Sequence, residues 1–131
     1  LPNQIQGDVY TGTDTVEYLA KGVPDRVFFA TNESVLTTAS RDTLRKQAAW
    51  MRTNDSLSFT IEGHADERGT REYNLALGER RANVAKDYLM TYGISGNRLS
   101  VISYGKERPV NSGSNPLAWS QNRRSVTVKA N

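Results

Sequence analysis

A strand pattern, a glycine-bounded loop and a long amphipathic helix follow one another between residues 57 and 92. Apolar and polar residues alternate from residue 57 to residue 62, which is typical of a half-buried strand. Thr70 is a suitable N-cap for the helix, and we expect the helix to end near Tyr92, where a glycine follows. A strand that leads directly into a helix favours a fold in which the helix packs on the face of a sheet.

The expected helix carries an arginine where an apolar side chain would be the ordinary choice. If Leu77 marks the centre of the buried stripe, Tyr73, Val84 and Tyr88 share its face. Arg81 then lies inside that stripe, roughly 40° from its centre at ~100° per residue. A guanidinium keeps its proton and is costly to bury unpaired, so we expect Arg81 to meet a carboxylate of the protein or of a ligand.

Asp66, in the loop just before this helix, is a candidate partner, and the pair allows two interpretations. An internal salt bridge between Asp66 and Arg81 would tie the loop to the helix. Alternatively, two opposite charges held a few ångströms apart would fit a zwitterionic ligand, with the guanidinium gripping a carboxylate by two parallel hydrogen bonds. Spacing alone favours the salt bridge, and both interpretations hold if the pair bridges only in the empty site.

The rest of the chain predicts an α/β sandwich of the order β-α-β-α-β-β. Residues 1–25 are rich in glycine, proline and polar residues, and we expect an arm with at most one short helix or strand. Residues 26–131 form the domain, a mixed sheet of about four strands with helices on one face. Strands are expected at 27–29, 57–62, 99–103 and 126–128, helices at 37–53 and 70–92, and one or two helical turns at 117–123.

Composition narrows the function classes. A chain of 131 residues, 37% hydrophobic and 24% charged, suits one soluble domain, and no apolar run approaches the roughly 18 residues of a membrane span. The absence of cysteine excludes disulfides and thiolate metal sites. The sequence starts with Leu1 and shows no signal peptide, so we expect that an N-terminal piece of a longer precursor has been removed.

Neither catalysis nor a cofactor is expected. His64 is the sole histidine, whereas metal sites usually need three or four ligands, and no nucleophile is paired with a base. A net charge of +3 leaves a basic nucleic-acid-binding domain as the alternative function. Its aromatic residues are not interleaved with basic pairs such as Arg123-Arg124, as base stacking requires, so we expect no nucleic acid.

Three ordered blocks, at residues 62–82, 101–109 and 122–128, carry a family resemblance. The first contains His-Ala-Asp-Glu-Arg-Gly-Thr at 64–70 and the pattern Asn-x-x-Leu-x-x-x-Arg-Ala at 74–82. These blocks resemble the peptidoglycan-associated lipoprotein (Pal) family, which belongs to the OmpA-like group of peptidoglycan-binding domains. The longer first run points to Pal within that group, and the resemblance covers about residues 26–129.

The resemblance implies a non-catalytic domain that binds the diaminopimelate residue of a peptidoglycan stem peptide. Asp66 would bind the side-chain ammonium of that residue and Arg81 its carboxylate. The loop after the first strand would point backbone N–H groups at the same carboxylate. The family usually has aspartate where Ala30 stands, so side-chain contacts are lost there while the N–H groups remain. The implied site comprises Phe29, Ala30, Thr31, Asp66, Arg68, Asn74, Leu77 and Arg81.

Two of these residues have equally good structural explanations. Leu77 could belong to the core, and Asn74 could form a local hydrogen bond to the preceding loop.

The resemblance also implies a tether between the outer membrane and the cell wall, on the periplasmic face of that membrane. The lipid anchor would sit on an N-terminal cysteine that this chain lacks. Within the Tol–Pal cell-envelope system the implied protein partner is TolB, at a surface that overlaps the peptidoglycan site; Glu67, Arg68 and Glu107 extend the match in this direction.

Overall fold

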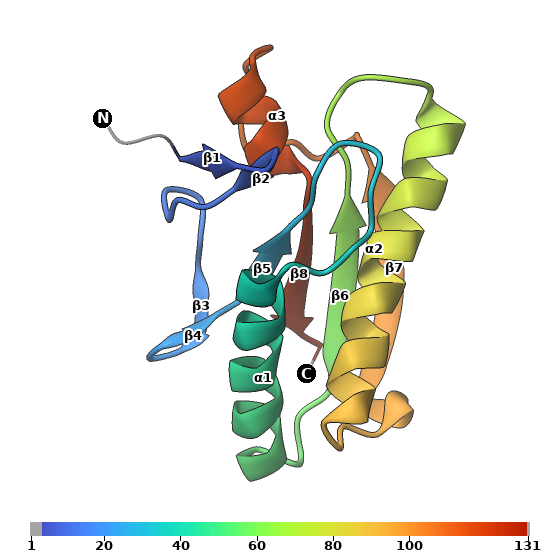
Figure 1. Cartoon of the computed structure of the whole chain (residues 1–131). Helices are drawn as coiled ribbons and strands as arrows, with labels where there is room; N and C mark the ends of the chain where they lie inside the picture. The colour runs from blue at the N-terminus through green and yellow to red at the C-terminus, as the bar shows by residue number, and fades with distance from the viewer. Residues whose placement is uncertain (1–3, 131) are drawn as a thin grey trace.

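The computed structural model describes residues 4–130, and a mixed four-stranded sheet forms its centre (Figure 1). The strand order is β5-β8-β6-β7, with β8 antiparallel to both neighbours and β6 parallel to β7. The four strands are β5 (Arg26–Phe28), β6 (Phe59–His64), β7 (Leu99–Gly105) and β8 (Arg124–Lys129). The expected mixed sheet of about four strands is confirmed.

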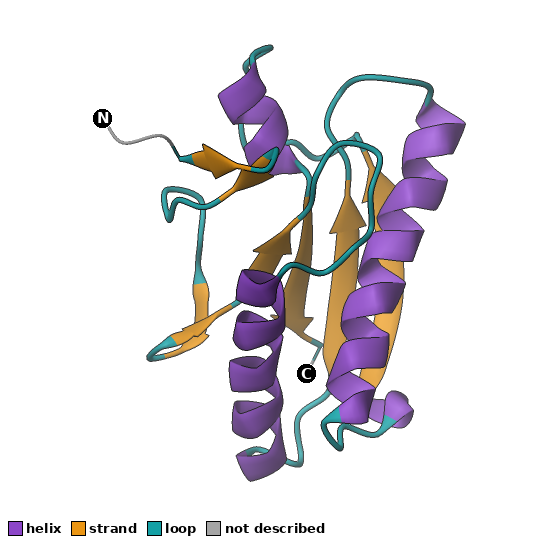
Figure 2. Cartoon of the chain, viewed as in Figure 1, coloured by secondary structure: helices purple, strands orange, loops and turns teal. Residues whose placement is uncertain are grey.

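Two long helices, α1 (Thr38–Thr53) and α2 (Arg71–Thr91), cover one face of the sheet, as expected (Figures 1 and 2). Each begins at a threonine whose hydroxyl accepts a backbone N–H three residues ahead: Thr37 caps α1 and Thr70 caps α2. A short 3₁₀ helix, η1 (Gly96–Arg98), leads into β7, and α3 (Pro116–Asn122) precedes β8.

The buried face of α2 matches the expected one only in part. Leu77 is buried, and Val84 and Tyr88 pack against the core, but Tyr73 is 42% exposed. The most buried side of the helix also includes Gly78, Ala82, Ala85 and Leu89. At ~100° per residue this face is rotated by roughly 80° from the stripe centred on residue 77. The physical reason is size, because small residues let the helix axis approach the sheet more closely than a stripe of large side chains would.

The main core lies between the sheet and the two long helices. The expected apolar face of α1 is confirmed, since Leu44, Ala48 and Met51 are all buried there. They pack with residues of β5, β6, α2 and β7. The cluster comprises Val27, Phe29, Leu44, Ala48, Met51, Phe59, Ile61, Ala82, Ala85, Leu89, Ile94 and Leu99.

The first 25 residues contain more structure than expected. The prediction of at most one short element is wrong, because two antiparallel hairpins form: β1 (Ile5–Gln6) with β2 (Val9–Tyr10), and β3 (Tyr18–Ala20) with β4 (Val23–Pro24). Gly7 and Asp8 both have positive φ, as a tight two-residue hairpin turn requires. The Tyr10 ring packs edge-on against Phe28 of β5 at 5.0 Å, so the domain supports the hairpin. A domain boundary at residue 25 stays a prediction.

Candidate functional site

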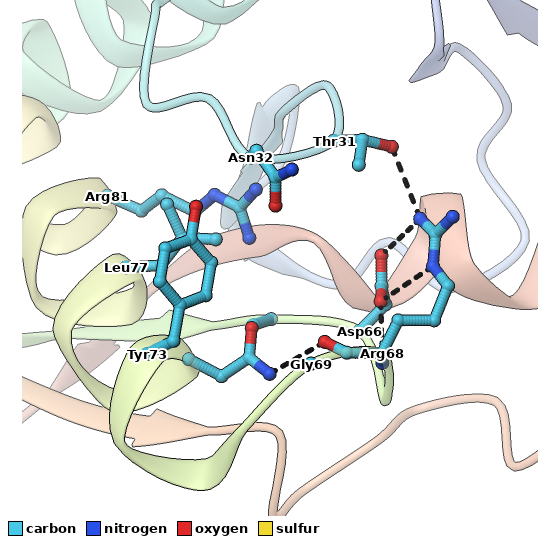
Figure 3. A pocket seen from close by; sticks show the side chains of 10 residues that line it. Thr31, Asn32, Asp66, Arg68, Gly69, Tyr73, Leu77 and Arg81 are labelled. Atoms are coloured by element: carbon cyan, nitrogen blue, oxygen red, sulfur yellow. Dashed lines mark hydrogen bonds and ion pairs between the residues drawn. The ribbon is translucent and has the colours of Figure 1, made fainter.

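A pocket of about 230 Å³ opens between the loops that follow β5 and β6 and the first turns of α2 (Figure 3). Strand β6 ends at His64 and α2 begins at Arg71, so the glycine-bounded loop forms one wall and the helix the other. The residues that line the pocket are Thr31, Asn32, Ala65, Asp66, Arg68, Gly69, Tyr73, Asn74, Leu77 and Arg81. Six of the eight site residues implied by the resemblance therefore meet here.

Arg81 is fully buried at the base of this pocket, with 0% of the residue exposed. Its guanidinium donates to three backbone carbonyls: Nε to Glu33 (2.9 Å), Nη1 to His64 (2.9 Å) and Nη2 to Ala30 (3.0 Å). Burial, and then the nearby charge of Arg123, lowers the pKa of Arg81 to about 10, so the side chain stays cationic at neutral pH. Among the described residues Arg81 meets carbonyl oxygens and no carboxylate of the protein, so that half of the expectation is wrong. A carboxylate from a ligand stays a prediction.

Asp66 faces other arginines. Its carboxylate accepts hydrogen bonds from Arg68 Nε (3.1 Å) and Nη2 (2.8 Å), and from Arg123 Nη1 (3.2 Å). Within residues 4–130 no ion pair joins Asp66 to Arg81, so the internal salt bridge is not the way this protein uses the pair. Burial would raise the pKa of Asp66, but these hydrogen bonds outweigh it and hold the pKa below the ordinary value. The carboxylate is thus ionised although only 6% of the residue is exposed.

The wall of the pocket is built by local contacts around the start of α2. The Asn74 side-chain amide donates to the carbonyls of Arg68 (2.8 Å) and Thr70 (3.0 Å), which is the expected local hydrogen bond to the loop. Gly69 has a φ of +93°, a conformation that side-chain-bearing residues rarely adopt. Leu77 is buried but stands apart from the main core cluster, and it forms the apolar part of the wall.

The loop after β5 is more fully engaged than expected. The Phe29 N–H donates to the Arg123 carbonyl (3.0 Å), and the Thr31 N–H donates to the Asp8 carboxylate (2.7 Å). Phe29 lies in the core and Ala30 offers its carbonyl to Arg81, and neither lines the pocket. In this arrangement at least two of the three N–H groups already have protein partners. Their role in ligand binding stays a prediction.

Sequence reasoning missed four residues of the lining and one behind it. Asn32, Ala65 and Gly69 come from the two loops, whose paths no local pattern predicts. Tyr73 was assigned to a buried stripe, although its spacing of four and eight residues from Leu77 and Arg81 already placed it beside them. Arg123 is buried behind Asp66 and donates a hydrogen bond to it. The Asn-Arg-Arg block at residues 122–124 was the sequence signal that could have identified Arg123 as a site residue.

A charged rim, which comprises Glu67, Arg68, Lys106 and Trp119, lies next to the pocket. The Arg68 guanidinium lies 4.2 Å from the centre of the Trp119 ring, and the Trp119 indole N–H donates to the Glu67 carboxylate (2.7 Å). The Lys106 ammonium donates to the Gly69 carbonyl (2.6 Å). Residues of the β6–α2 loop, the segment after β7 and α3 thus form one surface next to the pocket.

His64, the sole histidine, is buried at the end of β6 and stacks on Tyr104 at 5.5 Å between ring centres. Burial lowers its pKa, and its Nε2 atom lies 3.0 Å from the Glu62 carboxylate. Within the described part of the chain, no three histidine, cysteine, aspartate or glutamate side chains are grouped as a metal site would need. Nor does any helix of residues 4–130 have the length and apolar character to cross a membrane.

Comparison of the sequence with known protein families identifies the family of this chain. Residues 28–123 match the OmpA family. This chain belongs to the OmpA family. Its relatives there include the peptidoglycan-associated lipoprotein of Rhizobium meliloti, 54% identical over 106 residues, which cover 81% of this chain and 60% of the relative. That of Legionella pneumophila is 44% identical over 96 residues, covering 73% of this chain and 54% of the relative. The chain spans about 60% of the length of the curated relatives that it matches over 106 residues.

Two solved structures share the fold of this chain. The crystal structure of the peptidoglycan-associated lipoprotein from Burkholderia pseudomallei superposes with a TM-score of 0.78 at 33% identity, covering 80% of this chain and 89% of that one. The C-terminal domain of Helicobacter pylori MotB gives 0.76 at 18% identity, with coverage of 82% and 84%, and shows a common fold alone. The resemblance to Pal proteins and the fold class are confirmed.

Proposed function

We propose that this domain is a non-catalytic module that binds peptidoglycan through the diaminopimelate residue of the stem peptide. The observation that carries the proposal is a pocket with a buried anion and a buried cation among its lining residues. Asp66 supplies an ionised carboxylate, and Arg81 supplies a guanidinium with five N–H donors, of which three are used by carbonyls. Two donors, five minus three, remain for a ligand.

The end of a diaminopimelate side chain suits such a pocket because it carries both an ammonium and a carboxylate. The ammonium would meet Asp66, and the carboxylate would approach Arg81 and the loop at Thr31. The pocket volume of about 230 Å³ is smaller than the ~300–1,000 Å³ typical of sites for drug-sized ligands. It therefore fits the end of one amino-acid side chain rather than a whole sugar–peptide unit.

The family membership supports a place in the cell envelope. Relatives and a solved neighbour are named peptidoglycan-associated lipoproteins, so we infer that the full-length protein is lipid-anchored at the periplasmic face of the outer membrane and tethers it to the wall. The same relatives are not named as enzymes or nucleic-acid-binding proteins. No contact in the pocket favours the nucleic-acid alternative over a zwitterionic ligand.

We further propose TolB as the protein partner, at the charged rim. Glu67 and Arg68 are exposed beside Trp119, and Glu107 lies in the segment after β7. Exposed loop residues next to a binding pocket are common partner contacts. A partner seated on this rim would block the pocket mouth, so TolB and peptidoglycan would compete.

The decisive experiment compares two wall chemistries. Purified protein is sedimented with sacculi of the diaminopimelate type and of the lysine type, and free diaminopimelate or free lysine is added as competitor. We expect binding to the first wall only, reversed by diaminopimelate but not by lysine, because lysine lacks the terminal carboxylate. Equal binding to both walls would refute the proposed recognition.

A further inference from the structure

The turn of the first hairpin reaches the loop that borders the pocket. Asp8, in the β1–β2 turn, accepts a hydrogen bond from the Thr31 backbone N–H at 2.7 Å. Its other carboxylate oxygen lies 3.3 Å from Arg123 Nη2, and its own carbonyl accepts from the same nitrogen at 2.6 Å. One short turn thus contacts both the loop after β5 and the arginine that holds Asp66.

Asp8 completes a closed ring of polar contacts beside the pocket. Arg68 donates to the Thr31 hydroxyl (3.2 Å) and to Asp66 (2.8 Å), and Asp66 shares Arg123 with Asp8. Burial would raise the pKa of Asp8, but the Thr31 hydrogen bonds and the charges of Arg123 and Arg68 outweigh it and keep the pKa below its ordinary value. The ring therefore contains two ionised carboxylates, one on each side of Arg123.

Under the proposed function, the Asp8 carboxylate occupies the N–H group that a ligand carboxylate would use. A carboxylate that accepts a backbone N–H forms a charge-assisted hydrogen bond, and a ligand carboxylate at Thr31 would form the same bond. The Asp8 side chain is 53% exposed, whereas that of Arg123 is 3% exposed, so solvent screens the pair from the Asp8 side and weakens it. The hairpin that carries Asp8 has two residue pairs, too few for independent stability. These properties suit a contact that is exchanged rather than one that is permanent.

We propose that Asp8 is an internal latch on the carboxylate-binding side of the pocket. It holds the Thr31 N–H and Arg123 before a ligand binds, and a ligand carboxylate has to displace it. The hairpin β1–β2 thereby sets the affinity of the pocket. The inference rests on the proposed function, because the competing carboxylate is that of diaminopimelate.

The test is a titration of the whole chain with free meso-diaminopimelate, followed through the backbone N–H signals in nuclear magnetic resonance spectra. Asp8→Asn removes the charge while asparagine still tolerates the positive φ of this position. Asp14→Asn is the matched control, because Asp14 is exposed in the same segment and the same charge is lost away from the pocket. We expect Asp8→Asn to bind about 1.4- to 5-fold more tightly than wild type, the range of a solvent-screened ion pair.

Wild type and Asp14→Asn should bind alike, and the Thr31 signal of wild type should move with saturation of the ligand. Unchanged or weaker binding by Asp8→Asn would overturn the latch, and weaker binding would make Asp8 a positioning residue for the loop. An equal gain in both variants would reduce the effect to overall charge and also overturn it. If wild type binds but Asp8→Asn gains nothing, only the latch fails. If none of the three proteins binds diaminopimelate, the proposed function fails first.

Discussion

Arg81 links α2 to two other segments of the chain through single hydrogen bonds to the carbonyls of Ala30, Glu33 and His64. Those carbonyls belong to the loop after β5 and to the last residue of β6. The Arg81 guanidinium also lies 5.3 Å from the centre of the Phe29 ring, in the core. A side chain so placed stabilises the fold and shapes the pocket at once, and its loss would affect both.

Arg81→Lys tests the structural part of this dual role. We expect a loss of about 2–4 kcal/mol in the free energy of unfolding, because an ammonium cannot reach three carbonyls in a planar fork and leaves buried acceptors unsatisfied. Urea-induced unfolding of the variant and of wild type measures this difference in the free energy of unfolding. Arg80→Lys is the control, since Arg80 is the exposed neighbour on the same helix. Similar stability of the two variants would contradict the role inferred from the contacts.

Asp66→Asn tests the ligand-binding part. Asparagine keeps the size of the side chain but removes the charge that would meet an ammonium, so we expect affinity for diaminopimelate-type sacculi to fall about 10- to 100-fold, from roughly 1.5–3 kcal/mol. Asp87→Asn makes the same change at an exposed position of α2 and should bind like wild type. Circular dichroism of both variants separates binding from folding. Wild-type affinity in a folded Asp66→Asn protein would place the site elsewhere.

At the scale of secondary-structure elements, the contact between β6 and α2 determines where the pocket wall stands. Gly63 and Gly78 face each other there, and a Cβ built on Gly63 would lie 1.6 Å from the Gly78 carbonyl oxygen. A Cβ on Gly78 would lie 2.3 Å from the Ser103 hydroxyl of β7. No side chain fits between helix and strand at this level, so the helix is held close to the sheet and brings Arg81 within reach of the His64 carbonyl.

Gly78→Ala therefore has opposing effects of unequal size. Alanine gains about 1 kcal/mol of helix propensity over glycine. The added methyl group clashes with neighbours that cannot easily retreat, which typically costs about 1–3 kcal/mol and occasionally more. We expect a net loss of stability in urea unfolding and a weaker affinity for diaminopimelate. The control Asn83→Ala, on the exposed face of α2, should change stability little. A stabilised Gly78→Ala protein would show that the contact between α2 and β6 has room for a methyl group.

Across the whole molecule, the sheet brings distant segments together at one end. The loops after β5 and β6, the hairpin β1–β2 and α3 all lie at this end of the sheet (Figure 1). Arg123 shows how far apart in sequence these segments are. It donates hydrogen bonds to Asp8, Phe29 and Asp66, which lie 115, 94 and 57 residues away. The pocket and its charged rim are thus parts of one surface.

A partner on that surface should exclude the wall ligand. We expect calorimetric titration with TolB to give a measurable heat that free stem peptide suppresses. Glu67→Gln should weaken TolB binding, because it removes an exposed charge at the rim, while it leaves diaminopimelate binding unchanged, because Glu67 does not line the pocket. Absence of heat at micromolar concentrations would favour a domain that only grips the wall.

The sequence by itself determined the order and type of the principal elements. Alternation identified β6, the threonine caps marked both long helices, and the motif blocks led to the correct family. These features could be predicted because each depends on residues within a few positions of one another. The motif also led to most of the pocket lining, since the β6–α2 loop and the first turns of α2 are continuous in the chain.

Only the tertiary structure decided which partners the charged residues take. Arg81 bonds to carbonyls that lie 17, 48 and 51 residues away, and any residue presents a carbonyl, so no side-chain pattern marks them. Asp66 takes Arg123, which lies 57 residues away, where local spacing does not link the two side chains. The rotation of α2 depended on the Gly63–Gly78 contact between two elements, and the Asp8 contact depended on the path of a hairpin. Long-range packing selects among charge pairs that local spacing leaves equivalent.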